Sequence, residues 1–188
     1  QSEQSLVSAG IPIFYPANVH EVIPMGLQAF QLSRFSGLCV ALKITADTAD
    51  SNAVVDLSSL RPKNLNLIQK ESVHIVKHEP ALDREETLFT KRLPSAKNFI
   101  FENKINKVLQ YTKTKNLGII TVGKATTETI DALDSIGVFE PQKHGIGIFA
   151  CKVPWPLINK DIIEFSKGYK ELLVIEEKRG LVEEQVAH

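Results

Sequence analysis

The sequence has little of several features that define whole classes of protein. It has 2 cysteines in 188 residues and a net charge of zero. Two cysteines are too few for a disulfide-rich secreted framework, and both stand in apolar runs. We therefore expect Cys39 and Cys151 to be reduced core residues rather than a disulfide or a metal pair. A zero net charge gives no general argument for a nucleic acid or an anionic membrane as the partner.

Long apolar runs and a leader segment are also lacking. No apolar run approaches the roughly 20 residues that span a bilayer, and the first residues do not resemble a signal peptide. These features predict a cytoplasmic protein. The chain starts at Gln1 and its only methionine is Met25, so we expect it to be a piece of a longer polypeptide.

Charge is unevenly distributed under the zero total. Residues 61–115 hold 12 basic and 6 acidic side chains, whereas 1–60 and 116–188 are each net acidic. The basic middle segment could contact an acidic partner or the acidic face of another domain. The alternative, which we favour, is a solvated helix surface rich in lysine.

Residues 117–179 show the architecture most clearly. The run at 117–122 is apolar and β-branched, as in a strand buried on both faces, and Gly123 follows it. Thr126 or Thr127 can cap the next helix, which ends at Gly137. Three apolar side chains spaced by three residues define its expected inner side: Ile130, Leu133 and Ile136.

Two more strands complete this unit. Residues 146–153 form the second strand and 171–175 the third, and the helix between them ends at Gly168. The inner side of that helix is expected to carry Ile162, Ile163 and Phe165. Strand, helix, strand, helix, strand predicts parallel pairing with right-handed crossovers and the 117–122 strand in the middle.

A second strand–helix–strand unit occupies residues 11–44. Strands are expected at 11–16 and 38–44, with a helix between them that Asn18 and Glu21 cap and Gly37 ends. Pro24 predicts a kink or a restart of the helix. The apolar stripe consists of Val19, Val22, Ile23, Leu27 and Phe30. So short a unit leaves sheet faces and edges uncovered.

The stretch between the two units is mostly connector. Residues 45–66 are polar, 73–77 alternate as in a strand, and 107–111 form another short strand. Residues 81–101 read as a helix broken at Pro94, because the residue before a proline is disfavoured in the helical region.

Candidate chemistry gathers at the carboxyl ends of the 117–122 and 171–175 strands. Residues 118–125 approach a phosphate-binding loop, but the stretch between the glycines is a strand and Ala125 lacks the required hydroxyl. A weaker possibility is an anion at the helix that opens there. Crevice or interface candidates are Gly123, Lys124, Thr126, Glu177, Lys178 and Arg179. A solvated strand end is the alternative. The five histidines are scattered, and His74 and His78 stand on a predicted strand, so no metal site is predicted.

Several ordered segments resemble one known family. IPIFYPANVHE (11–21) and AFQLSRFSGLCVALK (29–43) are similar to the end of the pyrimidine-binding domain of 2-oxoacid:ferredoxin oxidoreductases. KRLPSA (91–96), LGIITVGK (117–124), WPL (155–157) and VIEEKR (174–179) resemble the long, fused indolepyruvate ferredoxin oxidoreductases. The resemblance covers nearly the whole chain in the right order.

The resemblance implies a fold and an activity. Residues 1–60 would be the tail of a thiamine pyrimidine-binding domain, 61–115 a connector with helices, and 116–188 a three-layer α/β domain of the transketolase C-terminal type. The family oxidatively decarboxylates aryl or branched 2-oxoacids. It uses thiamine diphosphate, Mg²⁺, iron–sulfur clusters and coenzyme A, with ferredoxin as acceptor. Expected partners are other domains of the same polypeptide and a second copy.

The sequence departs from the family in what it lacks. It has no CxxCxxxC motif and no GDG-type diphosphate motif. The fragment is therefore expected to be inactive alone, with no catalytic or cofactor-binding residue. Two hypotheses remain open: a structural portion of a thiamine-dependent oxidoreductase, and a free-standing α/β binding or assembly module.

Overall fold

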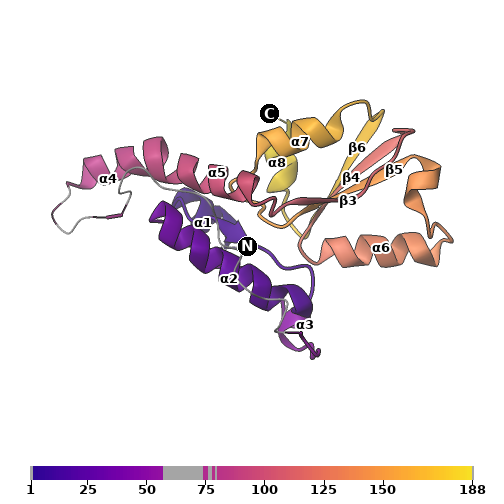
Figure 1. Cartoon of the computed structure of the whole chain (residues 1–188), viewed down its shortest axis with the longest axis horizontal. Helices are drawn as coiled ribbons and strands as arrows, with labels where there is room; N and C mark the ends of the chain where they lie inside the picture. Colours follow the sequence, from indigo (N-terminus) through magenta and orange to yellow (C-terminus); the bar gives the residue numbers. More distant parts are fainter. Residues whose placement is uncertain (1, 57–73, 76–77, 79, 188) are drawn as a thin grey trace.

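The computed structural model describes residues 2–56, 74–75, 78 and 80–187 (Figure 1). The predicted strand at 73–77 lies mostly outside these residues, as does the second half of the predicted connector. Within the described part, no helix is long and apolar enough to cross a membrane.

A four-stranded sheet forms the C-terminal half. Its strands are β3 (Lys107–Gln110), β4 (Leu117–Val122), β5 (Ile146–Cys151) and β6 (Glu171–Ile175), in the order β3-β5-β4-β6. β4 pairs in parallel with both β5 and β6, so the prediction of a central 117–122 strand is confirmed. β3 adds an antiparallel edge to β5.

Two helices cover opposite faces of this sheet. α6 (Ala125–Ser135) connects β4 to β5, and α7 (Asn159–Ser166) connects β5 to β6. The two crossovers step in opposite directions along the sheet, so two right-handed connections must lie on opposite faces. Figure 1 shows α6 below the strands and α7 above them. The predicted three-layer α/β architecture is confirmed.

The inner side of α6 differs from the prediction. Ala125, Thr126 and Thr129 are buried, whereas Ile136 is 72% exposed. Ile130 is also exposed and Leu133 half-buried. The small inward side chains let the helix lie close to the sheet, so the large ones point outward. The predicted threonine cap is also wrong, because the helix starts earlier, after Lys124, without a side-chain cap.

α7 follows the prediction more closely. Ile162 and Phe165 are buried, and Gly168 follows the helix in a left-handed conformation. Ile163 is exposed, because it stands about 100° around the helix from Ile162. A 3₁₀ turn (Pro141–His144) precedes β5, and α8 (Val182–Ala187) follows β6.

The N-terminal unit is the expected parallel strand–helix–strand. It contains α1 (Glu3–Ser8), β1 (Ile13–Phe14), α2 (Val19–Ser36), β2 (Ala41–Leu42) and α3 (Ala46–Ala49). β1 pairs in parallel with β2, but each strand is only two residues long. On its other side β1 meets the C-terminal half, where the Ile13 amide donates to the Trp155 carbonyl at 2.7 Å.

The ends of α2 follow from the sequence. Asn18 Oδ1 accepts the His20 amide at 3.1 Å, and Glu21 accepts the Ala17 amide at 3.0 Å, one residue earlier than a capping box requires. Gly37 ends the helix with φ of 71°. No restart occurs at Pro24, which stands inside one continuous helix.

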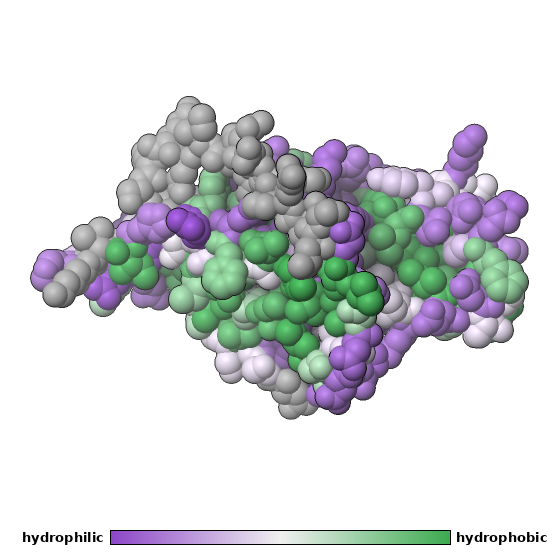
Figure 2. Space-filling model, turned by 60° about the horizontal axis from the view of Figure 1, so that its bottom comes forward, coloured by the Kyte–Doolittle hydropathy of each residue, from purple (hydrophilic) through white to green (hydrophobic). Residues whose placement is uncertain are grey.

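The buried side of α2 is not the predicted stripe. Its buried residues are Met25, Ala29, Leu32 and Ser36, and they pack against α5 and β2. Ile23, Leu27 and Phe30 are exposed on the other side. Figure 2 shows a green, apolar patch near the centre of one face of the molecule. The helix is apolar on two sides, so periodicity alone could not select the inner one.

The sequence predicted that the helix at 81–102 breaks at Pro94, and this prediction is wrong. α4 (Ala81–Thr87), a π-helical turn (Leu88–Arg92) and α5 (Leu93–Glu102) follow one another without a loop. In the π turn the Leu93 amide bonds to the Leu88 carbonyl, five residues back. This wider turn accommodates a proline that has no amide to donate.

Two apolar clusters form the core. One joins α2 and α5 around Phe14, Leu32 and Phe99, and the other fills the α7 side of the sheet around Tyr15 and Ile120. The neighbours Phe14 and Tyr15 thus point into different clusters. Cys151 is buried in the second cluster as predicted, but the prediction for Cys39, which precedes β2, is wrong, because this residue is exposed.

Candidate functional site

A small crevice lies at the carboxyl ends of β4 and β6, between the C-terminal sheet and the N-terminal unit. Its volume is about 90 Å³. The residues that line it come from both halves of the chain: Glu3, Gln4, Tyr15, Lys43, Val122, Pro154, Glu176, Glu177, Lys178, Arg179 and Leu181. Three of the six predicted residues are among them, and Gly123, Lys124 and Thr126 are not.

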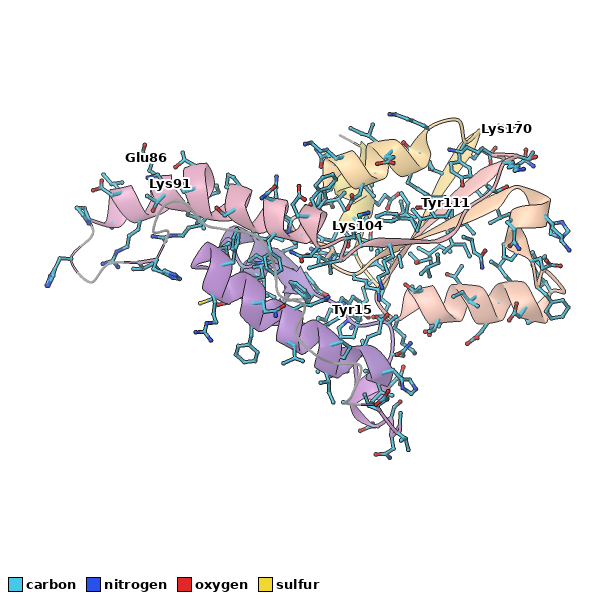
Figure 3. The ribbon with its side chains drawn as sticks, in the orientation of Figure 1. Tyr15, Glu86, Lys91, Lys104, Tyr111 and Lys170 are labelled. Atoms are coloured by element: carbon cyan, nitrogen blue, oxygen red, sulfur yellow. The ribbon has the colours of Figure 1, made fainter. Side chains whose placement is uncertain are left out.

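Tyr15 occupies the position where a ligand was predicted. Gly123 has φ of +54°, and a Cβ built on it would lie 2.3 Å from the Tyr15 ring. Tyr15 is only 2% exposed, and its hydroxyl donates to Glu177 Oε2 at 2.5 Å. Figure 3 places Tyr15 between the N-terminal unit and the C-terminal sheet. The ring therefore packs against Gly123 at the end of β4 and forms part of the crevice wall.

The start of α6 offers few free donors for an anion. The Thr126 amide bonds to the Gly123 carbonyl at 3.0 Å, and the Thr127 amide to the Lys124 carbonyl at 3.1 Å. The Thr126 hydroxyl is buried and donates to Thr121 Oγ1 at 3.0 Å. With the Thr126 and Thr127 amides and the Thr126 hydroxyl already bonded, this geometry gives the predicted anion site no support.

Lys124 points towards the N-terminal unit. Its Nζ contacts Asp47 on α3 and lies 2.9 Å from Glu128 on its own helix. These hydrogen bonds to Asp47 and Glu128 raise the pKa of Lys124. Lys124 therefore links α6 to α3, and its ammonium group is already paired with two carboxylates.

Tyr15 has a second polar neighbour in Lys43, which follows β2. Lys43 Nζ lies 4.1 Å from the centroid of the Tyr15 ring and 2.6 Å from Glu3 Oε1. Partial burial by itself would raise the pKa of Glu3, but the hydrogen bond from Lys43 and backbone hydrogen bonding lower it to about 2. Burial, together with the hydrogen bond to Glu177, raises the pKa of Tyr15.

Glu176 has a structural role that the sequence did not single out. Its carboxylate accepts the amides of Leu181, Val182 and Glu183 at 2.9 to 3.1 Å. A carboxylate at the first amides of a helix satisfies donors that have no partner within the helix. Glu176 thus caps α8 from the end of β6. The acidic pair in VIEEKR, at the end of a predicted strand, was the sequence feature that could have pointed to this cap.

Further contacts join the same two surfaces. The Tyr15 amide donates to the Lys152 carbonyl at 2.8 Å, and Lys152 Nζ pairs with Glu21. The Thr127 hydroxyl also contacts the Ala17 carbonyl at 3.4 Å. The carboxyl edge of the sheet is therefore an interface with residues 12–21. Among the described residues, no group of three or more His, Cys, Asp or Glu side chains could hold a metal ion.

Comparisons with known proteins bear on the family that this chain resembles. Residues 107–188 match the family model described as "Indolepyruvate oxidoreductase domain". The chain is 26% identical over 182 residues to the indolepyruvate oxidoreductase subunit IorA of Methanothermobacter thermautotrophicus and 24% identical over 184 residues to that of Pyrococcus abyssi. Each match covers 95% of this chain and 28% of the relative. The chain thus spans just over a quarter of these relatives.

Among solved structures, the 2-oxoglutarate:ferredoxin oxidoreductase of Magnetococcus marinus, solved with 2-oxoglutarate, coenzyme A and succinyl-CoA bound, is similar over 59% of this chain. It is 22% identical with a TM-score of 0.40, and the match covers 18% of that protein. The fused arrangement predicted from the sequence stays a prediction, since the matched relatives are named as subunits. The family model over residues 107–188 and the curated relatives support the resemblance to an indolepyruvate oxidoreductase segment that the sequence motifs predicted.

Proposed function

We propose that this chain is a structural segment of an enzyme that oxidatively decarboxylates indolepyruvate and other aryl 2-oxoacids, with ferredoxin as the electron acceptor. Its task is to hold two α/β units of that enzyme in one orientation. The observation that carries the proposal is the closed carboxyl edge of the sheet, where Tyr15 is hydrogen-bonded to Glu177 and leaves no room for a side chain at Gly123.

The residues of this segment do not fit the family's redox groups. An iron–sulfur cluster usually takes four thiolates, and the sequence has two cysteines, of which Cys39 is exposed and Cys151 buried. Burial also raises the pKa of the Cys151 thiol, which disfavours the thiolate that metals bind. Thiamine diphosphate, Mg²⁺, the clusters and coenzyme A would be held by other parts of the enzyme.

The alternative, a free-standing binding module that takes its ligand in this crevice, has less support from the geometry of the crevice. A crevice of about 90 Å³ is well below the several hundred Å³ of a typical small-molecule site. Its charged residues are largely paired or bonded, as with Glu3 and Lys43 or Glu176 and α8. The homodimer and the cytoplasmic location also belong to this proposal.

An activity assay on two chains tests the proposal. The complete polypeptide that contains this segment, purified anaerobically, should reduce ferredoxin when given indolepyruvate and coenzyme A. The 188-residue chain should not. Ferredoxin reduction by the 188-residue chain alone, or none by the complete enzyme with any aryl 2-oxoacid, would contradict the proposal.

A further inference from the structure

Helix α2 has an unusual composition for a helix with one side exposed. The twelve residues from Val22 to Ser33 carry no charged side chain. One side, with Met25, Ala29 and Leu32, is buried in the core. A surface helix normally places charges on its opposite side, whereas a helix that is apolar all round is normally buried.

The outer side of α2 carries a short apolar seam, which consists of Ile23, Leu27 and Phe30. Their exposed fractions are 42%, 40% and 74%. The spacing of four and then three residues places them in one line along the helix, as in helices that pack against another helix.

We propose that the α2 seam is an internal contact surface, covered in the complete enzyme by an uncharged apolar helix from another part of the same polypeptide. This inference rests on the proposed function, because it requires a longer chain. The curated relatives supply the length: this chain covers 28% of them, so nearly three quarters of each relative lies outside the matched region.

The small size of the seam favours a covalently linked occupant over a second copy. Three side chains spread over two helical turns, about 11 Å at 1.5 Å per residue. A stable association of separate chains usually buries about 800 Å² on each partner, far more than such a seam supplies. A segment of the same polypeptide has an effective concentration of about millimolar and needs much less contact area.

The charge of the seam argues against a membrane surface or a nucleic acid. Helices that lie on anionic membranes carry several Lys or Arg side chains beside the apolar face, and nucleic acid binding also depends on basic residues. On α2 the only Lys or Arg is Arg34, in the last turn. An uncharged apolar partner matches this composition.

Photo-cross-linking in the complete enzyme tests the inference. Benzoylphenylalanine replaces Phe30, and in a matched control it replaces Asp131, an exposed residue of α6. After irradiation, digestion and mass spectrometry, the probe at position 30 should join a peptide of the same polypeptide outside residues 1–188. Adding Leu27→Asp should abolish that product, and the probe at position 131 should not form it.

Three results would overturn the inference. These are a cross-link to a second copy, seen as a product of doubled mass; no cross-link at position 30 in an enzyme that is otherwise folded; and binding of the 188-residue chain to phosphatidylglycerol vesicles that Phe30→Asp abolishes. The ferredoxin assay is made separately on the unmodified enzyme. Failure of the proposed function and failure of this inference are therefore distinguishable.

Discussion

At the scale of single residues, Tyr15 explains why the carboxyl edge of this sheet holds protein instead of a ligand. Its ring lies against Gly123, its amide bonds to Lys152 and its hydroxyl bonds to Glu177. The aromatic ring supplies apolar contact while the hydroxyl reaches a polar partner, the combination that suits tyrosine to interfaces.

Gly123→Ala tests the close contact with the ring. The added Cβ would lie 2.3 Å from Tyr15, and φ of +54° already disfavours a side chain. Gly137→Ala is the matched control, because Gly137 has φ of +82° and nothing within 4 Å of a built Cβ. We expect the control to lose about 1 kcal/mol and Gly123→Ala to lose clearly more in urea unfolding. Equal losses would show that the Tyr15 ring does not restrict this position.

Tyr15→Phe tests the hydrogen bond to Glu177. Burial and that bond raise the pKa of the Tyr15 phenol in the folded chain. The stability this contributes is therefore fully present below the unfolded pKa of about 10 and is lost as the pH rises through the folded pKa.

The expected loss for Tyr15→Phe at pH 7 is about 1 to 2 kcal/mol, because Glu177 loses its donor. The variant should also lose part of the destabilisation that the parent shows above pH 10. The measurement is urea unfolding at a series of pH values from 7 to 11. Tyr111→Phe is the control, since Tyr111 is 78% exposed. Parallel curves for the parent and Tyr15→Phe would contradict the assignment.

At the scale of secondary structure elements, α8 depends on a residue outside itself. Its first amides bond to Glu176 at the end of β6, so this six-residue helix is tied to the sheet at its start. Short helices are marginal by themselves, and a carboxylate at the first turn stabilises them through both hydrogen bonds and the helix dipole.

Glu176→Gln should therefore loosen α8 selectively. The amide keeps one acceptor oxygen but loses the charge and the second acceptor, at an expected cost of about 1 kcal/mol. Hydrogen exchange at Val182 and Glu183 should become faster while exchange in β4 stays unchanged. Glu184→Gln, an exposed position in the first turn of the same helix, removes a charge but none of the hydrogen bonds to Glu176, so it should have a smaller effect. Unchanged exchange in Glu176→Gln would refute the cap.

At the scale of the whole molecule, the two α/β units are joined by core packing as well as by polar contacts. The neighbours Phe14 and Tyr15 belong to different apolar clusters, and the segment around Val153 and Leu157 also contributes to both. Trp155, the only tryptophan, stands within this segment and bonds to Ile13. If either cluster unfolds, the other loses residues that it packs against.

We therefore expect the chain to unfold in one cooperative transition. Leu32→Ala in the first cluster and Ile120→Ala in the second remove side chains that are fully buried, each at a cost of about 2 to 5 kcal/mol. In both variants the Trp155 fluorescence and the circular dichroism should change at the same lowered urea concentration. Two separated transitions in either variant would show that the units fold independently.

Much of the fold could be predicted because it depends on neighbouring residues. The strands at 117–122 and 171–175, the parallel order with 117–122 central, and the helix ends at Gly37 and Gly137 all follow from apolar runs and turn residues. Here the apolar runs in the sequence and the strands in the structure agree, because a strand that is buried on both faces needs a nearly continuous apolar run.

The inner sides of the helices and the content of the crevice were decided by tertiary structure. α2 is apolar on two sides, and only its packing against α5 determines that Leu32 is buried while Phe30 is exposed. Tyr15 and Glu177 are 162 residues apart in the sequence, so nothing local pairs them. The sequence by itself determined the main strands and helices and their order. Packing of the two α/β units against each other decided which helix sides are buried and what fills the crevice. Burial and hydrogen bonding there depend on residues that only the folded chain brings together.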